Sequence, residues 1–148
     1  GLCAFFFAHV CYLLLFVRSA QQHDAAWPPL LWRQPWLLLP FLGFSAWLLI
    51  AIGPRLGDLQ LPVLLYTLII TLMNLAALNR WRRVPDLSFA RVLAGGLLFM
   101  VSDSLIAISR FGGEALPLPW PSPWIMVTYM AAQYLLVTGM LAQLSSEQ

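Results

Sequence analysis

Five long apolar runs, separated by short polar or proline-rich stretches, constrain the fold of this chain more than any other feature. Each run is close to the ~20 residues that a helix needs to cross about 30 Å of hydrocarbon. Because a bilayer offers no water to satisfy backbone N–H and C=O groups, runs of this kind are expected to be α-helices. The expected spans are residues 1–17, 36–53, 61–79, 92–109 and 124–144. The sequence therefore predicts an all-α, polytopic transmembrane helix bundle, with residues 1–148 in a single transmembrane domain.

Composition supports this class and argues against several others. The chain is 61% hydrophobic and 9% charged, whereas soluble proteins carry about 25% charged residues. The net charge of +2 is too small to suggest nucleic-acid binding, because the arginines lie between apolar runs and not in a stripe. No Cys/His spacing resembles a metal site, so we expect no metal and no cofactor.

The arginines, which are the only strongly basic residues, predict the orientation. One side of the expected bundle holds Arg18, Arg33, Arg80, Arg82, Arg83 and Arg91, and the other holds Arg55 and Arg110. The positive-inside rule makes the first side cytoplasmic, and the tail from Ser145 to Gln148 with it. Tryptophans near the expected interfaces fit an aromatic belt; these are Trp27, Trp32, Trp36, Trp81, Trp120 and Trp124. We expect a multi-pass protein of a bacterial inner membrane.

The first residues of the chain do not look like a natural N-terminus. It begins at Gly1 and is apolar from Leu2, without the charged segment that opens a signal peptide. We therefore expect the natural N-terminus to lie upstream of Gly1.

Polar side chains inside the spans are the candidates for function, because such groups are costly at membrane depth. Asp103 stands out, since it is ionisable, costs about 3 kcal/mol at a helix centre, and has no cation nearby in sequence. It is either a structural hydrogen-bonding group or a catalytic or proton-carrying one, and we favour the second interpretation. The other polar residues in the spans are His9, Tyr12, Tyr66, Asn74, Ser102, Thr128, Tyr129 and Gln133. Asn74 lies deeper toward the cytoplasmic side, and we interpret it as structural.

Depth groups several of these residues. Counted from the outer ends of the spans, His9, Tyr66, Asp103, Tyr129 and Gln133 all fall ~9–15 Å below the outer boundary. Tyr129 and Gln133 are four residues apart and share one helix face. Scattered structural hydrogen bonds would not need to share a depth, so one polar layer built from four helices indicates a site. For His9 alone, an interhelical hydrogen bond is an equally good interpretation.

Three motifs resemble a known family. The stretch 1–12 resembles a "G-x-x-x-F-x-x-x-H-x-x-Y" pattern, residues 95–107 resemble "GALLFxxSDxxLA" with Arg110 and Phe111 following, and residues 126–135 resemble "TYYxAQxLI". These patterns are those of the YhhN family, the lysoplasmalogenase-like membrane proteins.

The resemblance implies about eight spans, of which these are the last five, and a missing span with a "GD" motif that carries a second acidic residue. The fragment alone is then expected to be inactive. Characterised members hydrolyse the vinyl-ether bond of lysoplasmalogens, which releases a fatty aldehyde and glycerophospho-ethanolamine or -choline. The implied substrate is a lysophospholipid that enters from the bilayer, with a loop arginine, not yet identified, meeting its phosphate.

The residues suit this chemistry, because vinyl-ether cleavage begins with protonation of a carbon atom and ends with capture of the cation by water. A buried carboxyl group is easier to keep protonated and can act as the acid, and a second carboxylate can orient the water. Asp103 is expected to be one of the pair, with the choice of acid left open. The residues expected to position water or substrate are His9, Tyr12, Tyr66, Ser102, Thr128, Tyr129 and Gln133.

Two other functions remain open. Asp103 could titrate in a proton-coupled transporter of small molecules or lipids, or the chain could be a structural or sensing subunit. The remaining acids all lie in connections or the tail and cannot serve as a second buried carboxyl; they are Asp24, Asp58, Asp86, Glu114 and Glu147.

Overall fold

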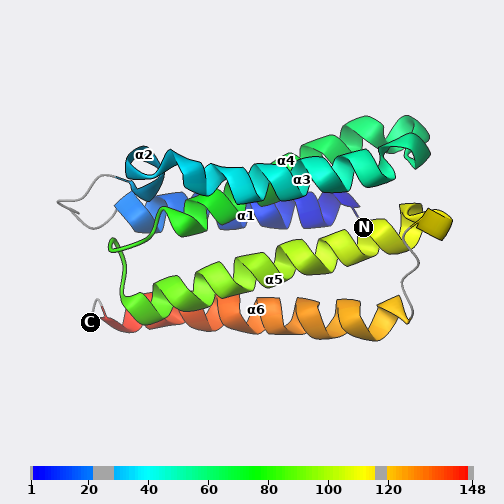
Figure 1. The fold of residues 1–148 in the computed structure, drawn as a ribbon. Helices are drawn as coiled ribbons and strands as arrows, with labels where there is room; N and C mark the ends of the chain where they lie inside the picture. The colour runs from blue at the N-terminus through cyan, green and yellow to red at the C-terminus, as the bar shows by residue number, and fades with distance from the viewer. Residues whose placement is uncertain (1, 22–28, 116–119, 147–148) are drawn as a thin grey trace.

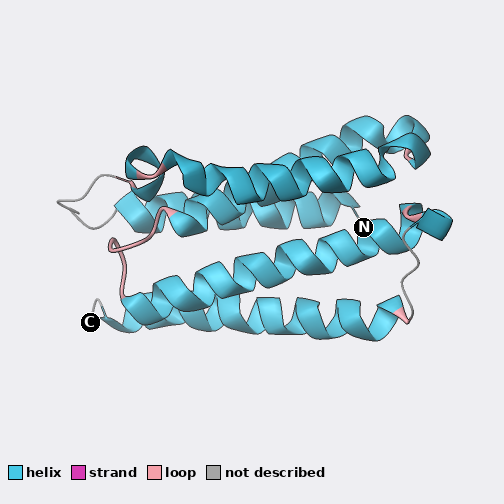
Figure 2. Cartoon of the chain, viewed as in Figure 1, coloured by secondary structure: helices cyan, strands magenta, loops and turns pink. Residues whose placement is uncertain are grey.

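The computed structural model describes residues 2–21, 29–115 and 120–146, and in those ranges the chain is helical without strands (Figure 2). The long helices are α1 (Leu2–Gln21), α3 (Leu38–Ile52), α4 (Gln60–Leu78), α5 (Asp86–Phe111) and α6 (Pro121–Ser146). A short helix, α2 (Leu30–Arg33), lies between α1 and α3, and 3-10 turns occupy Pro35–Leu37, Gly53–Arg55, Gly57–Leu59 and Gly113–Ala115.

Five segments are long and apolar enough to cross a membrane, which confirms the predicted class of polytopic helical bundle. They are Ala4–Gln21, Pro35–Arg55, Gly57–Leu78, Asp86–Phe111 and Pro121–Ser145. The largest difference from the predicted boundaries is at α5, which begins at Asp86 and not at residue 92. Pro85 precedes the helix with φ of −54°, and Asp86 complements the positive end of the helix dipole. The start of a helix estimated from the length of its apolar run alone does not include this polar first turn.

The helices lie side by side in two groups (Figure 1). α5 and α6 form an antiparallel hairpin with the most extensive contact in the bundle, while α4 contacts α1, α3 and α5. The end of α1, the helix α2, the α4–α5 turn and the end of α6 lie at one end of the bundle, which we call the arginine-rich end (Figure 1). The start of α1, the α3–α4 connection and the turn Gly113–Ala115 after α5 lie at the opposite end, which we call the outer end following the predicted orientation.

Glycines let α5 and α6 approach closely. A Cβ atom on Gly95 would lie 2.9 Å from Leu136 Cγ, and one on Gly139 would lie 2.8 Å from Val92 Cγ2. Large apolar side chains such as Ile50 and Leu141 are exposed on the outside of the bundle, as expected for a surface that faces lipid.

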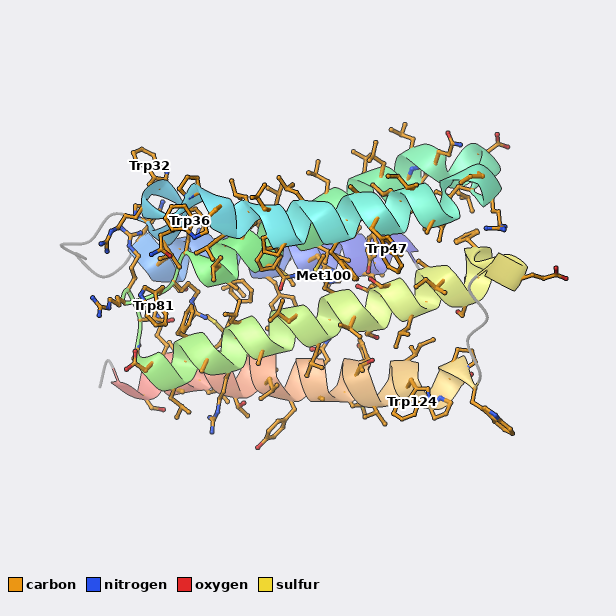
Figure 3. The ribbon with its side chains drawn as sticks, in the orientation of Figure 1. Trp32, Trp36, Trp47, Trp81, Met100 and Trp124 are labelled. Carbon is orange, nitrogen blue, oxygen red and sulfur yellow. The ribbon has the colours of Figure 1, made fainter. Side chains whose placement is uncertain are left out.

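Most of the tryptophans expected at the interfaces lie near the two ends. Trp32, Trp36 and Trp81 lie toward the arginine-rich end and Trp124 toward the outer end, whereas Trp47 lies within its span (Figure 3). Trp27 falls outside the described residues.

Arg80 lies between α4 and α5 on the arginine-rich side, and the structure adds that its side chain is enclosed. It is fully buried and donates from Nη2 to Ser88 Oγ and Gln143 Oε1, each at 2.8 Å. Its guanidinium carbon lies 5.5 Å from the centre of the Phe16 ring. Burial lowers the pKa of Arg80 to about 10, which still leaves the group charged near neutral pH. Arg80 therefore links α1, α5 and α6 at the arginine-rich end.

Candidate active site

Asp103 lies where α1, α4 and α5 meet. The Tyr66 hydroxyl on α4 donates a hydrogen bond of 2.9 Å to Asp103 Oδ2. His9 Nε2 on α1 lies 3.6 Å from the same oxygen. The Asp103 side chain is only 9% exposed and that of His9 is fully buried. Three residues that the sequence assigned to one depth on three spans are thus brought into one cluster.

Hydrogen bonding defines which His9 nitrogen carries a proton in the neutral ring. His9 Nδ1 lies 2.6 Å from the carbonyl oxygen of Phe5, four residues earlier on the same helix. A carbonyl oxygen can only accept, so Nδ1 carries the hydrogen and Nε2 of the neutral ring presents a lone pair. Nε2 has no hydrogen-bond partner among the described residues and faces the carboxyl group. A lone pair facing a carboxylate is unfavourable, so the His9–Asp103 pair is suited to hold one proton between its two members.

A second polar cluster joins α1 to α6. The Tyr12 hydroxyl donates to Gln133 Oε1 at 3.0 Å, and Gln133 Nε2 donates to the Tyr129 hydroxyl at 3.4 Å. The Phe99 ring lies between the two clusters, with its centre 4.6 Å from the His9 ring and 5.6 Å from the Tyr129 ring. The Phe99 ring therefore divides the predicted polar layer into two clusters. Only the cluster formed by α1, α4 and α5 includes Asp103.

Ser102 and Thr128 are not brought to the carboxyl group. Ser102 Oγ donates to the Ile125 carbonyl at 3.3 Å, and Thr128 Oγ1 donates to the Trp124 carbonyl at 2.8 Å. Neighbouring residues on a helix point about 100° apart, so Ser102 faces α6 while Asp103 faces α4. The expectation that these two hydroxyls position water or substrate gains no geometric support. Asn74 donates to the Ile70 carbonyl of its own helix, away from Asp103.

A cavity of about 520 Å³ adjoins Asp103, within the size range of small-molecule sites. Its wall comes from α3, α4 and α5 with Phe5 of α1, and it is mostly apolar, with Leu48, Val63 and Met100 among the lining residues. Met100 lies near the middle of the bundle in Figure 3. Asp103 and Tyr66 also line the cavity. Tyr66 and His9 approach Oδ2, and Oδ1 accepts no hydrogen bond from any described residue, so this oxygen is available to a ligand.

Comparison with known proteins identifies the family. The model of the YhhN family matches residues 1–140. The chain belongs to the YhhN family. Proteins named lysoplasmalogenase from Mycobacterium bovis (strain ATCC BAA-935 / AF2122/97) and Mycobacterium tuberculosis (strain CDC 1551 / Oshkosh) are each 35% identical to it over 143 residues. The matched region is 94% of this chain and 49% of each relative, so the chain spans about half the length of these relatives. No solved structure matches it significantly.

The motifs that resemble the YhhN family contribute every residue of the two clusters except Tyr66. Phe5, His9 and Tyr12 follow one another along one side of α1, so that His9 reaches Asp103 and Tyr12 reaches Gln133. The contact from the Phe5 carbonyl, which defines the His9 tautomer, was not predicted from the sequence, although the spacing of four residues is a usable signal. Nor was Arg110 predicted to be a cavity residue. No group of three or more His, Cys, Asp or Glu within the described ranges could hold a metal ion.

Proposed function

We propose that this chain carries part of the active site of an intramembrane hydrolase that cleaves the vinyl-ether bond of lysoplasmalogens. The central observation is a carboxyl group that lines an apolar cavity at membrane depth, with one oxygen available and a histidine able to share its proton. The family and the names of two relatives support the same reaction. The expected products are a fatty aldehyde and glycerophospho-ethanolamine or -choline.

In the proposed mechanism Asp103 acts from Oδ1, the oxygen that accepts no hydrogen bond from the described residues. The protonated carboxyl group gives its proton to the outer vinyl carbon, and the electron pair of the double bond forms the new C–H bond. The positive charge that develops is shared between the inner carbon and the ether oxygen. Water then bonds to the inner carbon, and its proton returns to the carboxylate, which gives a hemiacetal. The hemiacetal releases aldehyde when its bond to the glycerol oxygen breaks and that oxygen takes the hydroxyl proton.

Tyr66 and His9 act on the carboxyl group in this proposal. The Tyr66 hydroxyl holds Oδ2 and stabilises the carboxylate that remains after proton transfer. His9 can take up or return the proton that it shares with Asp103. A second carboxyl group, expected from the resemblance to lie in a span outside this chain, would orient the attacking water.

Hydrolysis in heavy water tests the chemistry directly. The natural full-length protein in detergent is given lysoplasmalogen in D₂O, and the aldehyde is trapped and analysed by mass spectrometry. Protonation of the vinyl carbon predicts one deuterium on the carbon next to the aldehyde group. Aldehyde without deuterium at this carbon would rule out the mechanism, and no aldehyde from a folded protein would rule out the substrate.

The transporter alternative and the orientation remain predictions. Proton flux driven by lysolipid in liposomes containing the protein, without aldehyde release, would favour transport. A reporter fused after Gln148 tests the expected cytoplasmic C-terminus.

A further inference from the structure

The cavity beside Asp103 has a cation at its outer end. Arg110 lies in the last turn of α5 and lines the same cavity as Asp103. The two residues are seven positions apart, which places them on one face of the helix about 10 Å apart along its axis. Between them Ile106 and Ala107 line the cavity, so an apolar wall joins the carboxyl group to the guanidinium.

Within the described ranges, Arg110 faces no competing anion. No ion pair links it to a carboxylate among the described residues. An arginine offers five N–H donors in a planar fork that matches the oxygens of a phosphate group. The positive group at this end of the cavity is therefore available to an anionic ligand.

The other arginines do not share this position. Six of the eight lie toward the arginine-rich end, far from the outer mouth of the cavity. Arg55 is at the outer end but lies against Gly113, just after α5, where its Nε is 3.2 Å from the position that a Cβ on Gly113 would occupy. Of the cavity-lining residues in the described part of the chain, Arg110 is the one arginine.

A lysophospholipid has the matching length. Seven bonds separate the outer vinyl carbon from the phosphorus atom, and at about 1.2 Å per bond in an extended chain they span about 8 Å. A contact of about 3 Å at each end brings this to about 14 Å. The rise of about 10 Å between the two residues along α5 extends to this length when the long, flexible Arg110 side chain reaches toward the outer end of the bundle. The aliphatic chain then lies along the apolar lining deeper in the bundle, toward Ile70 and Met100.

We propose that Arg110 binds the phosphate diester of the lysophospholipid and thereby places the vinyl ether at Asp103, with the headgroup at the outer end of the bundle. This inference rests on the proposed function for its substrate and selects one arginine as the phosphate ligand. It predicts that the phosphate contributes to the reaction only when Arg110 is present.

The experiment compares two substrates of equal chain length in the natural full-length protein. One is 1-alkenyl-glycerophosphoethanolamine, and the other is 1-alkenylglycerol, which has the same vinyl ether without phosphate. In Arg110→Gln, kcat/KM for the phosphorylated substrate should fall about tenfold or more, while the value for 1-alkenylglycerol changes little. Arg110→Lys should retain part of the preference, because it keeps the charge. The matched control, Arg55→Gln, should leave both values near those of wild type.

The possible outcomes separate the two proposals. An equal loss for both substrates in Arg110→Gln, or no loss for either, overturns the role of Arg110 and leaves the hydrolase intact. If wild type cleaves neither substrate, the proposed function fails, and binding of 1-O-alkyl-glycerophosphoethanolamine is compared with that of 1-O-alkylglycerol. A preference for the phosphorylated ether that disappears in Arg110→Gln supports phosphate recognition, and equal affinities overturn it.

Discussion

Asp103→Asn should stabilise the protein, whereas Asp103→Ala should destabilise it. His9 Nε2 is 3.6 Å from Asp103 Oδ2, beyond the usual hydrogen-bond range of about 2.7–3.2 Å. Asparagine has nearly the same shape as aspartate and carries no charge. An amide nitrogen near the place of Oδ2 can donate one hydrogen to the Tyr66 oxygen, and a shift of about 0.5 Å toward His9 lets it donate the other to His9 Nε2. Alanine removes the acceptor of the Tyr66 hydroxyl and leaves His9 Nε2 without a partner, as it is in the wild type.

The magnitude follows from the cost of one buried unpaired polar atom, which is about 1–3 kcal/mol. A new hydrogen bond to His9 Nε2 should therefore raise the thermal unfolding midpoint of Asp103→Asn by a few degrees. A stabilisation of about 1 kcal/mol corresponds to roughly 2–4 °C in proteins of this size. Asp103→Ala should lower the midpoint by a similar amount.

The assay is thermal unfolding of the natural full-length protein and both variants in one detergent, followed by tryptophan fluorescence. Equal decreases in the midpoint for Asp103→Asn and Asp103→Ala would refute the reasoning. That result would mean that the carboxylate is a satisfied structural hydrogen-bonding group.

Three further substitutions test the site and the packing. Tyr66→Phe removes the hydrogen bond to Asp103 and should lower kcat for aldehyde release about tenfold or more, whereas Tyr134→Phe, on the exposed side of α6, should not. Gly139→Ala should lower the unfolding midpoint, because overpacking costs about 1–3 kcal/mol, while Gly43→Ala, with nothing within 4 Å, should leave it unchanged or higher. Gln143→Leu removes an acceptor from the buried guanidinium after α4 and should also lower the midpoint in the same assay.

The class of fold could be predicted from the sequence because a bilayer restricts the chain to helices of one approximate length. The shared depth of His9, Tyr66 and Asp103 could also be predicted, since distance along a helix follows from counting residues. The contacts among these three side chains could not be predicted, because the rotation of each helix about its own axis depends on how the helices pack. The sequence therefore could not show that His9 faces Asp103 while Tyr12 faces Gln133.

Other features were not predictable from local pattern. Ser102 and Thr128 are polar residues at membrane depth, but their hydroxyls bind backbone carbonyls, as such side chains often do in helices. Arg80 looked like one of several loop arginines, and only the positions of α1, α5 and α6 around it show that it is buried. In each case the surroundings of the side chain depend on residues that are distant in sequence.

Aldehyde release by wild type and Asp103→Asn tests the central claim most directly. Both proteins are purified at full natural length, checked for folding by their unfolding midpoints, and assayed with lysoplasmalogen. We expect aldehyde from wild type and none above background from a folded Asp103→Asn. Full activity in Asp103→Asn would contradict the claim, because the carboxyl group would then play no part in the chemistry.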